Sequence, residues 1–284
     1  MLARQRQEVI LAEIRRTGAV QVHALVARLG VSDMTIRRDL DVLAKRGLLE
    51  KVYGGATSVV GRSTHEPGFE AKSVRALPQK EAVSARAASL IRPGTAIGIS
   101  AGTTTWTFAR FLEDVPELTV VTNSIRVADV LRSGGRTDRT VVLTGGVRTP
   151  SDALVGPVAV QTLRSLHLDM VFLGVHGMAD GAGFTTPNIN ESETDRALVE
   201  AGRRLVVLAD HTKWGVVGIS TIAALDEADV LVTDDGLPRD AREILEARID
   251  DVIIADVSAD YPDSYPDSYP DSYPDAYPAA EGEA

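Results

Sequence analysis

The chain has no cysteine among its 284 residues, which excludes disulfide bonds, thiolate metal sites and a cysteine nucleophile. It also has no apolar run near the roughly 20 residues that a membrane-spanning helix needs. The N-terminus carries Arg4, Arg6 and Glu8 instead of a continuous apolar stretch, so it does not resemble a signal peptide. These absences favour a cytoplasmic protein without membrane contact, and we expect no metal and no cofactor.

Basic residues are missing from the end of the chain, because 260–284 contain seven Asp or Glu and no Lys or Arg. A four-residue repeat begins at Tyr261-Pro262-Asp263-Ser264 and continues as far as Pro278. Proline at every fourth position blocks helices and sheet ladders, and the aspartates keep the segment solvated. We therefore predict that 258–284 form a disordered acidic tail outside the fold.

The segment from Val31 to Leu40 has the pattern of a helix that enters the major groove of DNA. Ser32 is a good N-cap, and Ile36, Leu40 and Leu43 recur at helical spacing to form one apolar stripe. Opposite or beside this stripe lie Met34, Thr35, Arg37, Arg38 and Lys45. A short helix with an apolar back and a cationic front is what major-groove recognition requires.

Two helices precede this one and a hairpin follows it. Residues 4–16 and 22–29 predict the two helices, and Gly30 provides the turn into the third. Leu48 to Tyr53 alternates like a strand, and Gly54-Gly55 suits a tight turn. Together these elements predict a winged helix-turn-helix domain over 1–57. The residues that we expect to contact double-stranded operator DNA are Ser32, Met34, Thr35, Arg37, Arg38, Lys45, Lys51 and Tyr53.

The local charge supports this interpretation over a small helical domain that merely carries surface arginines. Residues 1–60 hold ten Lys or Arg and six Asp or Glu, a net charge of +4 in a chain whose net charge is −10. A basic segment in an acidic protein is typical of a surface that binds phosphates.

The rest of the chain predicts a linker and a second domain. Gly61, Pro67, Gly68 and Pro78 punctuate a linker over 58–79. From 80 to 257, helices alternate with short apolar strands, expected at 95–100, 118–122, 140–144, 170–174, 205–209, 230–233 and 252–256. This alternation predicts an α/β fold, with a mostly parallel, Rossmann-like sheet covered on both faces. Ligands of such sheets lie beyond the carboxyl ends of the strands.

The loops at those strand ends suit an anionic sugar. Ala101-Gly102-Thr103-Thr104-Thr105 opens a helix, so free amides, a glycine and hydroxyls can surround a phosphate. Helix capping or a solvated loop explains each such residue singly, but three consecutive strand ends of this kind favour one shared site. The residues that we expect around the effector are Gly102, Thr103, Thr104, Asn123, Gly145, Gly146, Thr186, Asn190, Glu191 and Lys213.

The order of these motifs resembles the DeoR family of bacterial transcriptional regulators over about residues 4–257. The resemblance is carried by the 31–40 helix, Tyr53-Gly54-Gly55-Ala56, Gly102-Thr103-Thr104, Thr122-Asn123-Ser124, Gly145-Gly146, Gly183 to Thr186, and Lys213. It implies a sensor domain similar to ribose-5-phosphate isomerases and coenzyme A transferases. It also implies a homo-oligomer that represses a sugar-catabolism operon until a phosphorylated sugar binds. Many members carry an acidic residue where this chain has Ser100, which puts a hydroxyl contact of that carboxylate in doubt.

A sugar-phosphate isomerase with an accessory DNA-binding domain is the alternative function. Such an enzyme needs a base next to the substrate carbonyl, and Glu191 and Asp210 are the loop carboxylates that could serve. The helix-turn-helix favours a regulator without catalytic residues. Activation instead of repression stays open, because the sign of regulation depends on where the operator lies.

Overall fold

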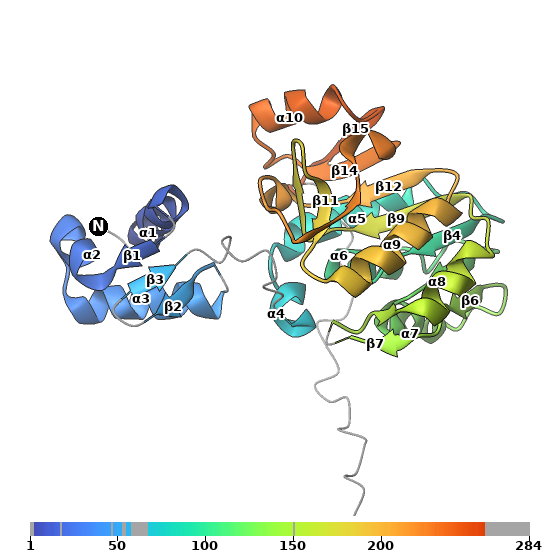
Figure 1. Cartoon of the computed structure of the whole chain (residues 1–284), viewed down its shortest axis with the longest axis horizontal. Helices are drawn as coiled ribbons and strands as arrows, with labels where there is room; N and C mark the ends of the chain where they lie inside the picture. The colour runs from blue at the N-terminus through green and yellow to red at the C-terminus, as the bar shows by residue number, and fades with distance from the viewer. Residues whose placement is uncertain are drawn as a thin grey trace, which may run out of the picture.

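The computed structural model describes residues 3–17, 19–46, 48–52, 55–57, 68–149 and 151–258. The first domain, coloured blue in Figure 1, combines three helices with a small antiparallel sheet in the order β1-β3-β2. Its elements are α1 (Ala3–Thr17), β1 (Ala19–Gln21), α2 (Val22–Leu29), α3 (Asp33–Lys45), β2 (Glu50–Val52) and β3 (Gly55–Thr57). The predicted winged helix-turn-helix is confirmed, and β1 is an additional strand that the sequence did not predict.

Local chemistry explains where α3 begins and how it packs. The Ser32 hydroxyl accepts a hydrogen bond from the Thr35 backbone amide at 3.3 Å, as expected of an N-cap. Gly30 ends α2 with φ +64°, a left-handed conformation that favours glycine. The apolar stripe of α3 is fully buried against α1 and α2. On the same helix, Asp39 is buried and accepts hydrogen bonds from Arg6 and Gln7 of α1, which joins the first helix to the third.

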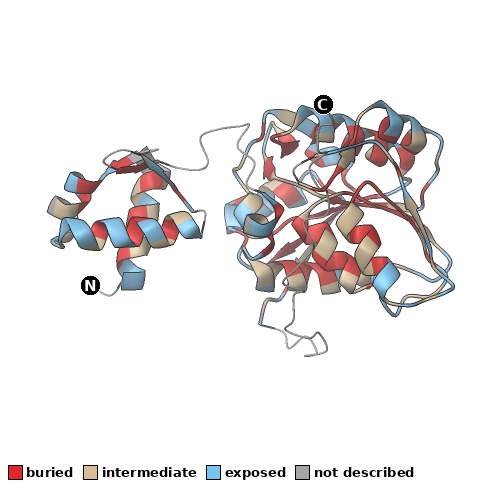
Figure 2. Ribbon diagram, turned by 90° about the horizontal axis from the view of Figure 1, so that it is seen from below, coloured by how far each residue is buried: buried red, intermediate tan, exposed pale blue. Residues whose placement is uncertain are grey.

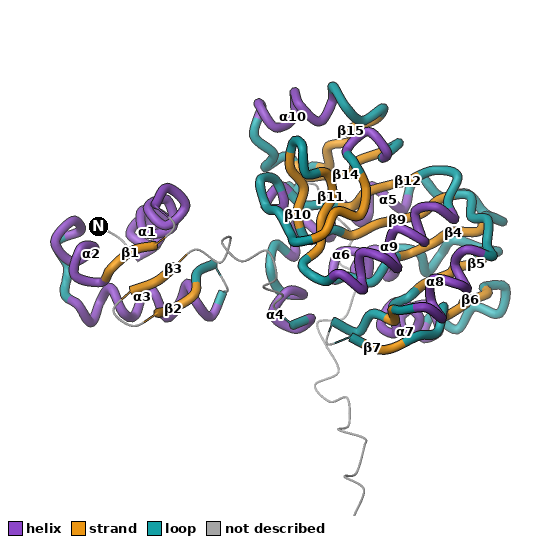
Figure 3. The backbone as a smooth tube through the Cα atoms, in the orientation of Figure 1, coloured by secondary structure: helices purple, strands orange, loops and turns teal. Residues whose placement is uncertain are grey.

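The second domain is built on a seven-stranded parallel sheet within the described residues (Figure 3). The strand order is β15 (Asp251–Ala255), β14 (Val230–Asp234), β12 (Leu205–Leu208), β9 (Met170–Gly174), β4 (Ala96–Ile99), β5 (Thr119–Thr122) and β6 (Thr140–Leu143). The chain moves from β4 to β5 and β6 on one side, then returns to β9 on the other. The order therefore reverses between β4 and β9, and such a switch point is where ligands of these sheets bind.

Successive residues of a strand pack alternately into two hydrophobic cores, one on each face of the sheet, which Figure 2 shows as buried layers. Phe172 packs in the core formed with α5 (Leu77–Ala88), α6 (Thr103–Arg110) and α7 (Ile125–Ser133). Its neighbours Val171 and Leu173 pack in the core formed with α8 (Pro157–Arg164), α9 (Ile189–Ala201) and α10 (Arg239–Glu246). Because side chains alternate across a strand, this pattern places helices on both faces, as predicted.

The last part of the predicted linker contains two helical segments, 69–73 and 77–79, separated by a turn at 74–76. Helix α4 (Phe69–Ser73) lies inside it, and α5 begins before residue 80. Phe69 is buried and meets the Trp106 ring edge-on at 5.6 Å, which anchors α4 by a contact distant in sequence. Pro78 lies in the first turn of α5, where a missing amide hydrogen is tolerated.

Several short elements were also not predicted. They are β7 (Val147–Arg148), β8 (Leu154–Val155), β10 (Gly177–Ala179), β11 (Gly183–Thr186), β13 (Ser220–Ala223) and two 3-10 turns, His211–Lys213 and Leu225–Glu227. β7 pairs with β8, and β10, β11 and β13 form a separate antiparallel sheet. The predicted strands of the parallel sheet are all present: 170–174 has the predicted bounds, and the others differ by one residue at one or both ends. Tyr53, residues 58–67 and the tail from 259 onward lie outside the described residues.

Candidate operator and effector sites

The outward face of α3 carries the side chains that the sequence analysis placed there. Met34 is 80% exposed, and Arg37, Arg38 and Lys45 are exposed as well. Thr35 is half-buried, and its hydroxyl lies 2.9 Å from that of Ser32, so this pair also serves the N-cap. The helix thus presents a cationic front, as major-groove recognition requires.

Two of the predicted DNA contacts are held by carboxylates of their own domain. Arg37 pairs with Asp33 one turn earlier, and Lys51 of β2 pairs with Asp41. The hydrogen bond from Lys51 lowers the pKa of Asp41 below its usual value. Within the described residues Arg38 makes no ion pair. Arg38 can therefore reach DNA without first leaving a carboxylate partner.

In the second domain, the Gly-Thr-Thr motif lies at the switch point of the sheet. Gly102 precedes α6, and Thr103 and Thr104 form its buried first turn. Gly102 has a φ of +157°, which side-chain-bearing residues rarely adopt. The Ser100 hydroxyl accepts a hydrogen bond from the Gly174 amide at 3.0 Å, which joins the ends of β4 and β9. The start of a helix with free amides at this position is suited to an anion.

Asn123 carries an unused hydrogen-bond donor beside this motif. Its side chain is 1% exposed, and Oδ1 accepts a hydrogen bond from the Ala101 amide at 2.8 Å. Its Nδ2 has no hydrogen-bond partner among the described residues. A buried donor without an acceptor costs about 1–3 kcal/mol, so an acceptor atom from a ligand is favoured at this position.

The remaining predicted effector residues have mixed surroundings. A Cβ on Gly146 would lie 2.5 Å from the Val155 carbonyl oxygen, so this glycine permits the close approach of β7 and β8. The Gly145 carbonyl oxygen accepts a hydrogen bond from the Thr144 hydroxyl, the Thr186 hydroxyl accepts one from the Asn188 amide, and Asn190 is exposed. The N-cap of α9 is Asn188, whose Oδ1 accepts hydrogen bonds from the amides of Asn190 and Glu191. Neither Asn190 nor Glu191 is therefore the N-cap of α9.

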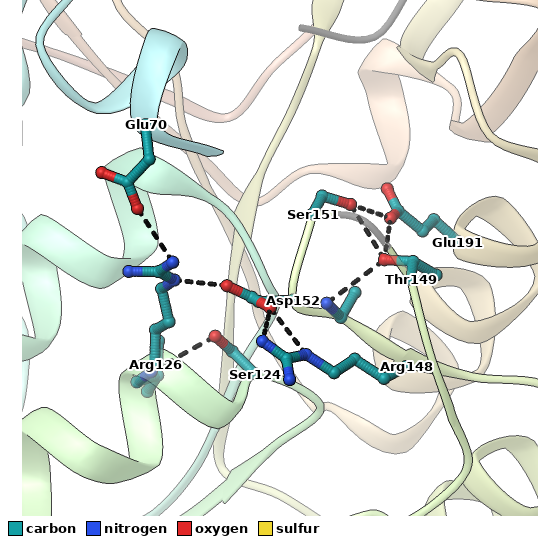
Figure 4. A network of polar contacts seen from close by, with 10 residues as sticks. Glu70, Ser124, Arg126, Arg148, Thr149, Ser151, Asp152 and Glu191 are labelled. Atoms are coloured by element: carbon teal, nitrogen blue, oxygen red, sulfur yellow. Dashed lines mark hydrogen bonds and ion pairs between the residues drawn. The ribbon is translucent and has the colours of Figure 1, made fainter. Parts of the chain in front are cut away.

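Glu191 is connected to the turn between β7 and β8 (Figure 4). Its Oε1 accepts a hydrogen bond from the Thr149 hydroxyl at 2.9 Å and another from the Ser151 hydroxyl. Strand β8, which follows this turn directly, reaches Asn123, because the Leu154 amide donates a hydrogen bond to the Asn123 carbonyl oxygen at 2.7 Å. Glu191 and Asn123 are thus joined through one turn, although they lie in different elements.

A group of cations near the end of β12 was largely missed from the sequence. Its members are Lys72, Arg75, Lys80 and Lys213, with the buried Asp210 among them. Lys80 is 2% exposed, and its Nζ donates a hydrogen bond to the Lys72 carbonyl oxygen. Burial, together with the charges of Lys213, Lys72 and Arg75, lowers the pKa of Lys80 to about 8 despite Asp210. Burial also lowers the pKa of Lys213.

This cation group adjoins the Gly-Thr-Thr motif through α5. Ser84, one turn after Lys80, donates a hydrogen bond to the Thr104 carbonyl oxygen at 3.5 Å. The sequence contained a signal for Lys80, because Lys80, Val83 and Ala87 recur at helical spacing and all three are buried. A lysine within an apolar helical stripe is unusual and indicates a specific charge environment.

Comparisons with known proteins agree with this architecture. Residues 6–61 match the DeoR-like helix-turn-helix domain and residues 75–235 match the DeoR C terminal sensor domain. A winged helix-turn-helix followed by a sensor domain defines a transcriptional regulator. The chain belongs to the DeoR family, whose regulators bind DNA, and the isomerase alternative is not supported.

Three curated relatives match over nearly their whole length. The HTH-type transcriptional regulator YgbI of Escherichia coli K12 is 38% identical over 86% of this chain and 95% of that protein. The putative aga operon transcriptional repressor of E. coli O157:H7 is 33% identical, with coverages of 88% and 93%. The glycerol-3-phosphate regulon repressor of E. coli K12 is 28% identical, with coverages of 85% and 94%.

Among solved structures, ribose 5-phosphate isomerase A of Methanocaldococcus jannaschii aligns with 48% of this chain and 53% of its own. The TM-score is 0.35 and the identity is 16%, so nothing about activity follows. No helix among the described residues is both long enough and apolar enough to cross a membrane.

Proposed function

We propose that this regulator represses a sugar-catabolism operon in the cytoplasm and releases its operator when a phosphorylated sugar binds at the switch point of the sheet. The observation that carries the proposal is the unused donor of Asn123 beside the first turn of α6 and the cation group around Lys80. A phosphate supplies the negative charge, and a sugar supplies hydrogen-bond acceptors. Two relatives, a putative aga operon repressor and a glycerol-3-phosphate regulon repressor, are consistent with such a role.

Each predicted residue has a part in this proposal. The amides and hydroxyls of Gly102, Thr103 and Thr104 hold the phosphate, with Lys80 and Lys213 balancing its charge. Asn123 and Glu191 bind the sugar hydroxyls. Thr186, Asn190, Gly145 and Gly146 lie at the edge of the proposed effector site. The proposed operator contacts, in the other domain, are Ser32, Met34, Thr35, Arg37, Arg38, Lys45, Lys51 and Tyr53.

A screen of sugar phosphates tests this function directly. We would measure the melting temperature of the full chain with ribose 5-phosphate, fructose 1-phosphate, galactose 6-phosphate and glycerol 3-phosphate, each beside its unphosphorylated counterpart. A ligand that binds only the native state raises the free energy of unfolding by mass action, by about 2.7 kcal/mol at 100 times its Kd, and the melting temperature rises with it. The proposal requires that such a ligand also release DNA. If ligands that raise the melting temperature left the operator complex intact, the sensor role would be wrong.

The pH dependence of effector binding follows from Lys80. Because its pKa in the folded chain is about 8, Lys80 loses its charge between pH 7 and 9.5, while a sugar phosphate keeps its own. We expect the effector affinity to fall about tenfold over that interval, the cost of losing one charged hydrogen bond. Titration calorimetry at the two pH values measures the change. Lys80→Met should weaken this dependence, and an equal tenfold fall in that variant would remove Lys80 from the site.

Ligand-free stability should change with pH in the opposite direction. An unfolded chain keeps the Lys80 proton up to about pH 10.5, whereas the folded chain loses it near 8, so the unfolded state holds more protons between these values. The free energy of unfolding therefore rises between pH 8 and 10.5 through this group.

We also infer that the protein binds its operator as at least a dimer. One winged helix buries roughly 600–1,000 Å² on DNA, which is little for tight operator selection. Sedimentation velocity at the concentration that protects an operator is expected to show a dimer or a larger species. A monomer under those conditions would contradict the inference.

A further inference from the structure

A network of hydroxyl and charged side chains leads from the candidate effector site toward the start of the sensor domain (Figure 4). Its first part is the turn between β7 and β8, and we call Thr149, Ser151 and Asp152 of this turn the clasp. The clasp hydroxyls of Thr149 and Ser151 bind Glu191. The hydroxyls of a sugar offer the same hydrogen-bond donors, so an effector that binds Glu191 competes with the clasp.

Asp152 links the clasp to α7 through an ion pair with Arg126. Asp152 is 6% exposed and has φ +63°, a left-handed conformation that few residues other than glycine adopt. Its carboxylate binds Arg126 of α7 and accepts a 2.7 Å hydrogen bond from Arg148 Nε. Burial raises the pKa of Asp152, but the hydrogen bonds from Arg126 and Arg148 lower it by more, so its net shift is downward.

Arg126 in turn reaches α4. Its guanidinium carbon lies 4.1 Å from the centre of the Phe69 ring, and one of its amino groups lies 2.9 Å from Glu70 Oε1. The Glu70 side chain is exposed, so that ion pair contributes little alone, whereas Phe69 is buried. Helix α4 begins at Phe69, and β3 of the DNA-binding domain ends at Thr57. The network therefore ends at the first described helix after the DNA-binding domain.

We infer that the clasp couples effector binding to the DNA-binding domain: an effector that displaces Thr149 and Ser151 from Glu191 shifts Asp152, and Arg126 passes this shift to α4. The inference rests on the proposed function, because it assumes a polyol at Glu191. Allosteric coupling requires an element with two arrangements that both ligands bias. In this inference one arrangement is the clasp bound to Glu191, as in the structure, and the other is the clasp displaced by the effector. Arg126 and Asp152 are positioning residues here, and neither needs to touch effector or DNA.

The clasp can be opened without any effector. Thr149→Val/Ser151→Ala removes both hydroxyls that bind Glu191, and Asp152→Asn removes the charge that holds Arg126. Asparagine tolerates a positive φ, so the turn is expected to persist. The operator would be a duplex selected from random sequences by the wild-type protein. We expect both variants to bind it about tenfold more weakly without any sugar, within the range of typical coupling.

Asp138→Asn is the matched control. Asp138 pairs with Arg136 and belongs to neither the clasp nor α4, so its loss should leave operator affinity within twofold of the wild type. Circular dichroism melts would show that all variants are folded at the assay temperature. If Asp152→Asn does not fold, the operator affinity of Thr149→Val/Ser151→Ala alone tests the inference.

Wild-type operator affinity in the folded clasp variants would overturn the inference. The same holds if Asp138→Asn weakens binding as much as they do, because the effect would then not be specific to the clasp. Neither result touches the proposed function. That function fails instead if the wild-type protein itself selects no DNA or responds to no sugar phosphate.

Discussion

Replacing Arg38 by alanine is expected to weaken specific operator binding by roughly 5- to 150-fold, the equivalent of about 1–3 kcal/mol for a base-reading arginine. Arg38 lies on the exposed face of α3 and makes no ion pair within the described residues. Arg37→Ala should have a smaller effect, because Arg37 must first leave Asp33 to reach DNA. Gel-shift titrations with the selected operator and with an unrelated duplex measure both variants.

Two comparisons make the Arg38 result interpretable. Arg242→Ala removes an exposed arginine from α10 and changes the net charge equally, so it should leave operator affinity unchanged. A base contact lowers specific affinity much more than non-specific affinity, whereas a phosphate contact lowers both. If Arg38→Ala bound the operator as tightly as the wild type, α3 would not be the recognition helix.

The second large effect is expected at the effector site. Thr103→Ala/Lys213→Ala should bind the operator normally and fail to release it at effector concentrations that free the wild-type protein completely. The change removes the Thr103 hydroxyl from the first turn of α6 and the Lys213 ammonium from the cation group around Lys80. Charged hydrogen bonds contribute about 1.5–3 kcal/mol each, so the effector affinity should fall at least tenfold. Release is measured by fluorescence anisotropy of a labelled operator.

Thr162→Ala/Arg164→Ala is the control for this experiment. It removes a threonine hydroxyl and a cation from α8, where the Thr162 hydroxyl donates a hydrogen bond to the Val158 carbonyl oxygen of its own helix. The control should respond to effector as the wild type does. If the Thr103/Lys213 variant also released its operator at wild-type effector concentrations, the phosphate would bind elsewhere.

Features set by nearby residues were predictable from the sequence. The start of α3 depends on Ser32 and on an apolar stripe within one helix, and the parallel strands are short apolar segments of their own. The positions of Gly102 and Asn123 followed from the rule that ligands bind where such strands end. Their proximity is shown by the hydrogen bond between the Ala101 amide and Asn123 Oδ1.

Features set by distant packing were not predictable. The helical spacing of Lys80 with Val83 and Ala87 indicates its burial, but no local pattern indicates that α4 and the end of β12 lie beside it. Helix α4 itself depends on the contact of Phe69 with Trp106. The ion pair of Arg37 with Asp33 was predictable, because the two residues are four apart on one helix. The ion pair of Lys51 with Asp41 was not, because it joins two different elements.

Under the proposed function, the unused donor of Asn123 lowers the stability of the ligand-free domain and raises its affinity for an effector. The unpaired Nδ2 amide costs roughly 1–3 kcal/mol of folding free energy, and this cost is removed when an acceptor binds. The same free energy therefore adds to the affinity for a ligand that supplies the acceptor. An apolar residue such as leucine at position 123 would remove that cost, at the loss of the Ala101 contact. Selection for a more heat-resistant protein would therefore tend to produce one that no longer senses its effector.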